Sequence, residues 1–365
     1  MKICIVTYDE YINIPYVQTY EDILKAKGIA YDIVLWNRSG QGGDTPPGAA
    51  QSFVFVQTTK ASKLSKVLPF LRWRRFVKSI LRRGRYDGLI LCTTMPGVLL
   101  SDVLTKGYPG KYLLDIRDYT YENQPLYRRI SQNNLRAAGL VCISSEGFLR
   151  WLPPDLGYTV THNLSNTAMA VESAPSFETQ TTRTIGFVGG LRYYDVNKRL
   201  IDHFGNNGRY RLFYAGKQHP GCDLAAYCEG HGIGNVDFLP RFHNAQKPEL
   251  YKQIDLINSV YGADSEETRS LLPHRLYDCA LFKKPILVSK GTYLEEVVQR
   301  YGLGCAIDHR SEDIASRIES YIATFDPAAF LAGCAAFLQT ALRDEALCRE
   351  RMDVFFDSLS PRVSP

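Results

Sequence analysis

The 365-residue sequence lacks several features that would assign its class at once. It has no run of about 18 apolar residues, which a membrane-spanning helix requires. No charged segment followed by an apolar run opens the chain, so we expect no signal peptide. Its nine cysteines are odd in number and include no CxxC pair, which argues against a disulfide framework or a structural zinc site. These absences favour a globular cytosolic protein with reduced thiols.

Familiar catalytic and metal motifs are also missing. The sequence contains no Walker, HExxH or Ser–His–Asp pattern, and its seven histidines are dispersed without metal-ligand spacing. We therefore expect neither a metal nor a cofactor. The net charge of +5 is mild.

What the sequence does contain is an alternation of short apolar runs with helical segments. Most runs are apolar on both faces, as strands covered on both sides must be, and the alternation predicts parallel, doubly wound sheets. The expected strands are Lys2–Tyr8, Tyr31–Trp36, Ser52–Gln57, Gly88–Cys92, Lys111–Asp115, Leu140–Ile143, Tyr158–Thr161, Thr184–Val188, Arg211–Ala215, Asn235–Leu239, Asp255–Val260, Pro285–Ser289 and Cys305–Asp308.

A change of composition predicts two α/β Rossmann-like domains. Residues 164–183 are rich in Ser, Thr, Ala and Pro and form the expected linker between residues 1–163 and 184–342. The tail after Ser311 is predicted to be helical with a break at Pro327, and a helix at about 343–365 to pack back on the first domain. Open α/β sheets bind ligands beyond the carboxyl ends of their strands. Two such sheets facing across a cleft suit transfer between two substrates.

Glycines and cations follow two strands of the second half. Gly189 and Gly190 close one strand and allow a backbone to approach a ligand closely, and Arg192 and Lys198 place cations beside them. Fixed cations stabilise a diphosphate leaving group as its charge develops. Lys217 follows another strand end. The alternative is a tight turn with solvated cations.

A helix that begins near Pro273 carries the next set of candidates. Proline suits the first turn of a helix, and the amides that follow favour an anion. His274 and Arg275 lie in that first turn, and Asp278 lies one turn beyond His274 on the same face.

These segments resemble the donor-binding domain of GT-B glycosyltransferases, especially the family-4 enzymes of bacterial polysaccharide synthesis. The likeness covers about residues 184–308 and rests on Ile185–Arg192 with Lys198, on Tyr214–Lys217, and on Leu272–Ser289 with Glu295, Glu296 and Gly304. It implies a nucleotide-sugar donor site formed by Gly189, Gly190, Arg192, Lys198, Lys217, Arg241, His274, Arg275 and Asp278.

The resemblance assigns particular roles and has one departure. It places Asp278 on the nucleotide ribose and Arg241 near the base; a solvated helix carboxylate is the alternative for Asp278. The family's Glu-x7-Glu pair would place a glutamate at Ser270, whereas Glu266 and Glu267 lie off register. Retaining or inverting chemistry therefore stays open.

The first half supplies candidates for the acceptor side. Asp115, Arg117 and Asp118 follow a strand, and either aspartate could polarise an acceptor hydroxyl. Together with Arg192, the two aspartates are the predicted catalytic residues. The alternative is an Asp–Arg–Asp pairing that only fixes a loop. Tyr8–Glu10, His162 and Asn163 also follow strands.

A basic, aromatic stretch lies at Lys63–Arg83. From Pro69 it predicts a helix with an apolar face of Phe70, Trp73, Val77, Ile80 and Leu81 beside basic residues. The basic residues are Arg72, Arg75, Lys78, Arg82 and Arg83. A basic face bordered by aromatic residues suits an anionic membrane surface, and no nucleic-acid module accompanies it. The alternative is that the apolar face packs on the sheet.

Together these features predict a glycosyltransferase acting on a saccharide acceptor, which we expect to be lipid-linked. The resemblance to family-4 enzymes implies a role in bacterial surface polysaccharide synthesis. The expected location is cytoplasmic, with peripheral binding to the inner face of the plasma membrane. The alternatives are a sugar-nucleotide epimerase of the same architecture and a non-catalytic partner subunit.

Overall fold

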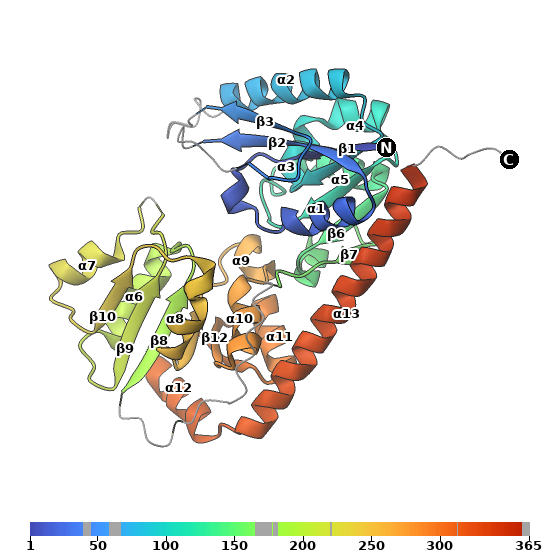
Figure 1. Ribbon diagram of the computed structural model, residues 1–365. Helices are drawn as coiled ribbons and strands as arrows, with labels where there is room; N and C mark the ends of the chain where they lie inside the picture. Colours follow the sequence, from blue (N-terminus) through green and yellow to red (C-terminus); the bar gives the residue numbers. More distant parts are fainter. Residues whose placement is uncertain are drawn as a thin grey trace. The chain divides into compact units, whose positions relative to one another are not determined.

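The computed structural model describes residues 1–38, 45–57, 67–164, 177, 182–219, 221–311 and 313–359. The chain forms two compact units: Met1–His162 with Arg343–Pro365, and Asn163–Leu342 (Figure 1). Most of the predicted linker at 164–183, and residues 63–66 of the basic stretch, lie outside the described residues.

The first unit is built on a parallel sheet of seven described strands in the order β3-β2-β1-β4-β5-β6-β7. The strands are β1 (Lys2–Val6), β2 (Ala30–Asn37), β3 (Gln51–Val56), β4 (Gly88–Cys92), β5 (Tyr112–Ile116), β6 (Leu140–Ile143) and β7 (Thr159–Val160). The connecting helices are α1 (Val17–Ala26), α2 (Val67–Gly84), α3 (Thr94–Leu99), α4 (Ser101–Gly107) and α5 (Pro125–Ala137), with 3-10 turns η1 (Tyr11–Asn13) and η3 (Glu146–Arg150).

The second unit repeats this plan with six described strands in the order β10-β9-β8-β11-β12-β13, again parallel. The strands are β8 (Arg183–Val188), β9 (Tyr210–Ala215), β10 (Val236–Leu239), β11 (Leu256–Ser259), β12 (Ile286–Ser289) and β13 (Gly304–Ile307). The helices are α6 (Tyr194–Phe204), α7 (Leu224–Gly230), α8 (Lys247–Lys252), α9 (Glu266–Ser270), α10 (His274–Phe282), α11 (Tyr293–Tyr301) and α12 (Ile314–Ala323), with the 3-10 turn η4 (Asn244–Gln246).

Both sheets confirm the predicted fold class of two doubly wound α/β domains. Every strand expected from the sequence corresponds to an observed strand. In each sheet the strand order reverses once, between β1 and β4 in the first unit and between β8 and β11 in the second. Ligands of open α/β sheets bind at such a switch point, outside the carboxyl ends of the strands.

One long helix, α13 (Pro327–Leu359), belongs to both units. It begins at the proline where a break was predicted. Its first half contributes Phe330, Cys334 and Phe337 to the core of the second unit, and its second half contributes Met352 and Phe356 to the core of the first. No single helix in the described part of the chain is long and apolar enough to span a membrane; α12 and α13, bent by 99°, satisfy that test only as a pair.

The apolar face of α2 packs against the sheet. This was the alternative to membrane binding for this face of the segment. Trp73 is fully buried and stacks on Trp36 of β2 with ring centroids 6.2 Å apart, and Val77 and Ile80 join the same core. Figure 1 shows α2 lying along β2 and β3. Burying this face removes large apolar side chains from water, so these residues belong to the core. That the basic residues of this segment bind a membrane stays a prediction.

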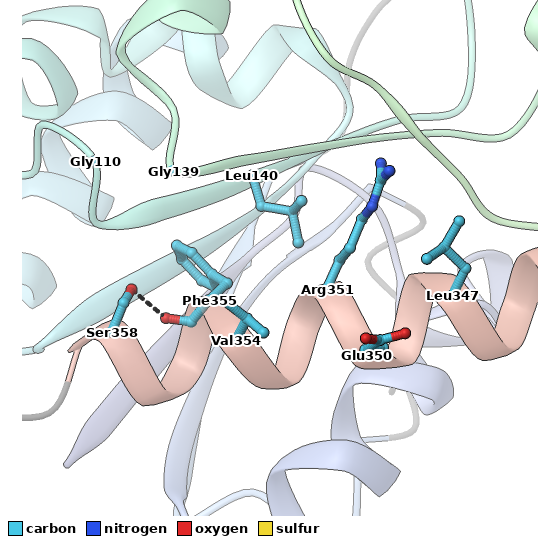
Figure 2. Close-up of a pocket in the computed structure, with 9 residues that line it drawn as sticks. All are labelled: Gly110, Gly139, Leu140, Leu347, Glu350, Arg351, Val354, Phe355 and Ser358. Atoms are coloured by element: carbon cyan, nitrogen blue, oxygen red, sulfur yellow. Dashed lines mark hydrogen bonds between the residues drawn. The ribbon is translucent and has the colours of Figure 1, made fainter.

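Two surface grooves lie at the amino ends of strands. Figure 2 shows the first, where Gly110, Gly139 and Leu140, at the starts of β5 and β6, meet Arg351 and Phe355 of α13. The second lies beside Asn207, Arg211 and Asn235 in the other unit. Both grooves are thus at the opposite edge of the sheets from the switch points.

Candidate functional site

A buried arginine lies at the switch point of the second unit. Arg275, in the first turn of α10, donates a hydrogen bond from Nη1 to the carbonyl oxygen of Val188, the last residue of β8, at 2.8 Å. Its guanidinium carbon lies 3.7 Å from the ring centroid of Phe187 and 5.1 Å from that of Tyr261, which follows β11. The side chain thus spans the two strand ends at which the sheet order reverses.

The guanidinium of Arg275 forms no ion pair with a carboxylate of the described residues, although the Asp278 carboxylate one turn along α10 partly offsets its charge. The residue is 6% exposed, Nε is buried without a hydrogen-bond acceptor, and no carboxylate of the described residues lies within 4 Å of the guanidinium. Burial lowers the pKa of Arg275 to about 10, because desolvation disfavours the cation. A buried charge is costly unless it is paired. This position is therefore suited to an anion supplied by a ligand.

Close backbone approach makes room for this arrangement. Gly189 has φ of +141°, and a Cβ there would lie 2.8 Å from Nη1 of Arg275. Gly216, at the end of β9, has φ of +139°, and a Cβ there would lie 1.9 Å from the carbonyl oxygen of Gly189. Residues with a side chain would clash at both positions and rarely adopt these angles. The glycines thus let the strand ends and the guanidinium meet.

Exposed cations border the same strand ends. Arg192 is exposed and donates from Nε to Nε2 of His219 at 3.2 Å, and Lys217 is exposed after β9. Burial, followed by the charges of Arg192 and Lys217, lowers the pKa of His219. The neutral imidazole can accept the bond from Arg192. These residues add positive potential around the loop of Gly189 and Gly190.

At the carboxyl edge of the first unit, one predicted aspartate is buried and the other is exposed. Asp115, at β5, is fully buried and accepts two hydrogen bonds from Nε of Arg117, at 3.0 and 2.8 Å. The Arg117 guanidinium also lies over the Tyr16 ring at 4.4 Å. This ion pair fixes the loop and does not favour a role for Asp115 as a base. Asp118 is exposed.

Solved structures share this architecture over almost the whole chain. HepE of Anabaena, in complex with UDP and glucose, has a TM-score of 0.69 at 16% identity, covering 97% of this chain and 100% of that one. Sucrose-phosphate synthase of Thermosynechococcus elongatus has a TM-score of 0.66 at 12% identity, with 98% and 96% covered. WaaG, a glycosyltransferase involved in lipopolysaccharide biosynthesis, has a TM-score of 0.59 at 12% identity, with 93% and 95% covered.

The chain has the GT-B fold. Neither a protein-family model nor a curated protein matches the sequence. At these identities the likeness is one of fold. The resemblance seen in the sequence is therefore confirmed at the level of GT-B architecture, and the narrower family-4 assignment stays a prediction.

Two predicted donor residues of this GT-B chain have partners within the protein. Both carboxylate oxygens of Asp278 accept from Nζ of Lys247, at 3.1 and 2.9 Å, and the hydroxyl of Tyr251 donates to one of them at 2.8 Å. All three residues are buried, so Asp278 is not the solvated carboxylate of the alternative interpretation. Nζ of Lys198 donates a hydrogen bond to the Asp202 carboxylate at 2.8 Å and lies 4.6 Å from the ring centroid of Tyr227. Arg192 and Arg275, by contrast, have no carboxylate partner among the described residues.

Other predicted positions are exposed around the strand ends. His274 is exposed beside Arg275, and Arg241 is exposed two residues beyond β10. Ser270, where the family would place a glutamate, is buried, and its hydroxyl donates to the carbonyl oxygen of Glu266. Glu267 instead accepts from the hydroxyl of Tyr193, at 3.2 Å. The structure thus places the Glu267 carboxylate near the switch point, three residues before the position at which the family spacing would place a glutamate.

Aromatic residues of this site escaped the sequence argument. Tyr193 and Tyr261 have ring centroids 5.0 Å apart, and Phe187 lies under Arg275. Phe187 belongs to an apolar strand, so its sequence context indicates a core residue. Tyr261 is 74 residues further along the chain, so nothing in the sequence connects the two. The only available signal was that both residues stand at strand ends. In the described residues, no group of three His, Cys, Asp or Glu side chains could hold a metal; that transfer is metal-independent stays a prediction.

The pKa of His219 should report anion binding at this site. We expect it below the ordinary value of 6.5 in the free protein, and we expect it to rise when pyrophosphate is added, since the anion offsets Arg192 and Lys217. Because the unfolded chain binds the proton more tightly, this histidine should lower the free energy of unfolding as pH falls through about 6.5. An NMR titration of the imidazole measures the pKa.

Arg192→Gln is the matched control for this titration. Removing the nearer cation should raise the pKa of His219 without any ligand and reduce its response to pyrophosphate. If the pKa of His219 changes neither when pyrophosphate is added nor when Arg192 is replaced, then His219, Arg192 and Lys217 do not form one electrostatic site.

Proposed function

We propose that this protein is a glycosyltransferase whose second unit binds the diphosphate of a nucleotide sugar at the ends of β8 and β11. The observation that carries the proposal is the buried Arg275 guanidinium at the switch point of a GT-B sheet, which forms no ion pair with a carboxylate of the described residues. A nucleotide diphosphate supplies the missing negative charge, and Arg forms paired hydrogen bonds with phosphate oxygens.

The same residues account for catalysis of sugar transfer. As the glycosidic bond of the donor breaks, negative charge grows on the leaving diphosphate. Arg275 is held by Val188 and two aromatic rings, so it needs no reorganisation to stabilise that charge. Arg192 adds a second cation from the exposed side. In the first unit, Asp118 is the accessible carboxylate that can accept the proton of an acceptor hydroxyl.

The structural neighbours suggest which donor to test first. HepE was solved with UDP and glucose, and a trehalose-6-phosphate protein of E. coli with a TM-score of 0.69 and 11% identity was solved with UDP-2-fluoro glucose. We propose a UDP-sugar as the donor of this chain on that likeness of fold. The proposed acceptor is a saccharide, lipid-linked, in the synthesis of a bacterial surface polysaccharide.

Nucleotide sugars should protect the protein against thermal unfolding. At a concentration 100 times Kd, a ligand that binds only the folded state adds about 2.7 kcal/mol, which raises the midpoint by several °C. Arg275→Met should abolish this shift because it removes the buried cation. Differential scanning fluorimetry with UDP-, GDP-, ADP- and CMP-sugars measures the effect.

Arg209→Met is the matched control, since it removes the same charge from an exposed residue at the amino end of β9. It should respond to the donor like the parent. If Arg275→Met is folded and still protected, the diphosphate binds elsewhere. Release of UDP that is faster with a polyprenyl-linked saccharide would distinguish a transferase from an epimerase.

The exposed side of α2 supports membrane binding in place of its buried face. Val67, Leu68 and Leu71 are 57%, 60% and 43% exposed, and Arg72 and Arg75 are exposed beside them. We call these five residues the α2 surface. Two other cations of the helix, Arg74 and Lys78, are already paired with Asp102. Apolar side chains next to exposed arginines suit the interface of an anionic membrane, and peripheral binding there would place a lipid-linked acceptor within reach.

Neutralising the α2 surface should weaken binding to anionic vesicles. Each cation near the surface contributes about 1 kcal/mol, so Arg72→Gln with Arg75→Gln should lower the partition coefficient roughly thirtyfold. Co-sedimentation with phosphatidylglycerol vesicles measures this. Arg128→Gln with Arg129→Gln, on α5, is the matched control and should bind like the parent. Equal binding of the parent to phosphatidylcholine vesicles would contradict the electrostatic account.

A further inference from the structure

The first unit also contains a poorly compensated arginine at its switch point. Arg38 follows β2, and its guanidinium carbon lies 4.8 Å from the ring centroid of Tyr8 and 4.9 Å from that of Trp36. Its Nε and Nη2 atoms are buried without hydrogen-bond acceptors, and its guanidinium forms no ion pair with a carboxylate of the described residues, although Glu10 accepts from its backbone N–H at 3.0 Å. The guanidinium is thus held between two rings, and its Nε and Nη2 donors have no acceptor in the described part of the chain.

A strained residue faces the same place. Thr93 directly follows β4, the strand on the other side of the switch point, and has φ of 72° and ψ of 169°. That conformation is nearly restricted to glycine, and it is costly for a β-branched residue. Thr93 is held by a hydrogen bond from its N–H to the carbonyl oxygen of Asp115, at 2.7 Å, and its buried hydroxyl lies beside the side chain of Tyr8. Such strain is concentrated at ligand sites.

Tyr8 connects these groups. It follows β1, and its pKa is raised by burial and then by the Asp118 carboxylate, whereas the neighbouring Arg38 and Thr93 lower it. Four residues from the ends of four strands therefore lie close together: Tyr8 after β1, Arg38 after β2, Thr93 after β4 and Asp118 after β5. A cation with free donors and an accessible carboxylate occur in one place. A ligand that satisfies both must carry an oxyanion and a hydroxyl group.

We infer that Arg38, Tyr8 and Thr93 form a binding site for an oxyanion on the acceptor, so that the acceptor is an acidic saccharide bearing a carboxylate or a phosphate. The anion pairs with the guanidinium of Arg38, and a hydroxyl of the same molecule reaches Asp118. Arg presents two parallel N–H donors, which match a carboxylate or phosphate. This inference deepens the proposed function, on which it rests, by naming the class of acceptor.

Binding of glucose 6-phosphate and of glucuronate, compared with glucose, tests the site in the full-length chain. We expect at least one of the two anions to bind and neutral glucose to bind at least tenfold more weakly. The anion that binds identifies phosphate or carboxylate as the group recognised. Isothermal titration calorimetry gives the dissociation constants without requiring a donor. Failure of both anions to bind would overturn the inference.

Substitutions of single arginines show where on the protein the anion binds. Arg38→Met should weaken anion binding at least tenfold, as loss of charge-assisted hydrogen bonds does, whereas Arg129→Met, at an exposed arginine of α5, should have no effect. Arg275→Met should also leave this binding intact. That variant separates the two proposals, since it impairs only the donor site. If anion binding survives Arg38→Met and is lost in Arg275→Met, the anion occupies the second unit and the inference is wrong.

Arg38→Lys covers the case in which the methionine variant does not fold. It keeps the charge and much of the stacking on Tyr8 and Trp36 but loses the planar fork. We expect it to bind the anion about tenfold more weakly than the parent. Unchanged binding in a folded Arg38→Lys protein, together with unchanged binding after Tyr8→Leu, would show that the anion does not contact this site.

Discussion

The second unit depends on holding one positive charge without a partner at the end of β8. Arg275 donates to Val188 and lies between Phe187 and Tyr261, so its position fixes how α10 meets the ends of β8 and β11. Gly189 has to lack a side chain for the guanidinium to fit. Burying an unpaired cation opposes folding. The simplest physical reason for this arrangement is that a substrate anion completes it.

Other charges nearby show that the fold can pair buried groups well. Asp278 has Lys247 and Tyr251, and Asp115 has Arg117. Breaking such a buried pair typically costs about 3–5 kcal/mol, because the remaining charge is left without compensation. These pairs stabilise the strand ends on which the two sites stand. Arg275 and Arg38, whose guanidinium groups form no ion pair in the described residues, lie at the two switch points, where a doubly wound sheet binds ligands.

The sequence was sufficient to predict the strands and the fold class, because strands buried on both faces appear as short apolar runs between helical segments. It also predicted that Arg275 and Gly189 belong to one site, since both stand where strand ends converge. It could not show that Asp278 pairs with Lys247, 31 residues away, because that contact depends on how α8 packs against α10. For α2, the sequence pattern favoured a membrane over packing on the sheet. The stacking of Trp73 on Trp36 shows that the apolar face packs on the sheet, a contact that depends on the folded chain.

Arg38 and Thr93 show a different limit of sequence reasoning. A single arginine after a strand has no distinguishing pattern, and a positive φ at a threonine leaves no trace in the composition. The significance of these two residues comes from the Arg38 donors that have no acceptor in the described residues, from the backbone strain at Thr93, and from their shared place in the sheet. All three are properties of the folded chain. The same is true of Glu267, which reaches Tyr193 from a register that the family spacing would not select.

The most direct test of the central claim is a crystal structure of this chain with UDP, in which the distance from Arg275 to the diphosphate is measured. The account predicts a phosphate oxygen within hydrogen-bonding distance of the Arg275 guanidinium, with Arg192 on the exposed side of the same group. A diphosphate bound away from the ends of β8 and β11, with Arg275 contacting only protein, would contradict it.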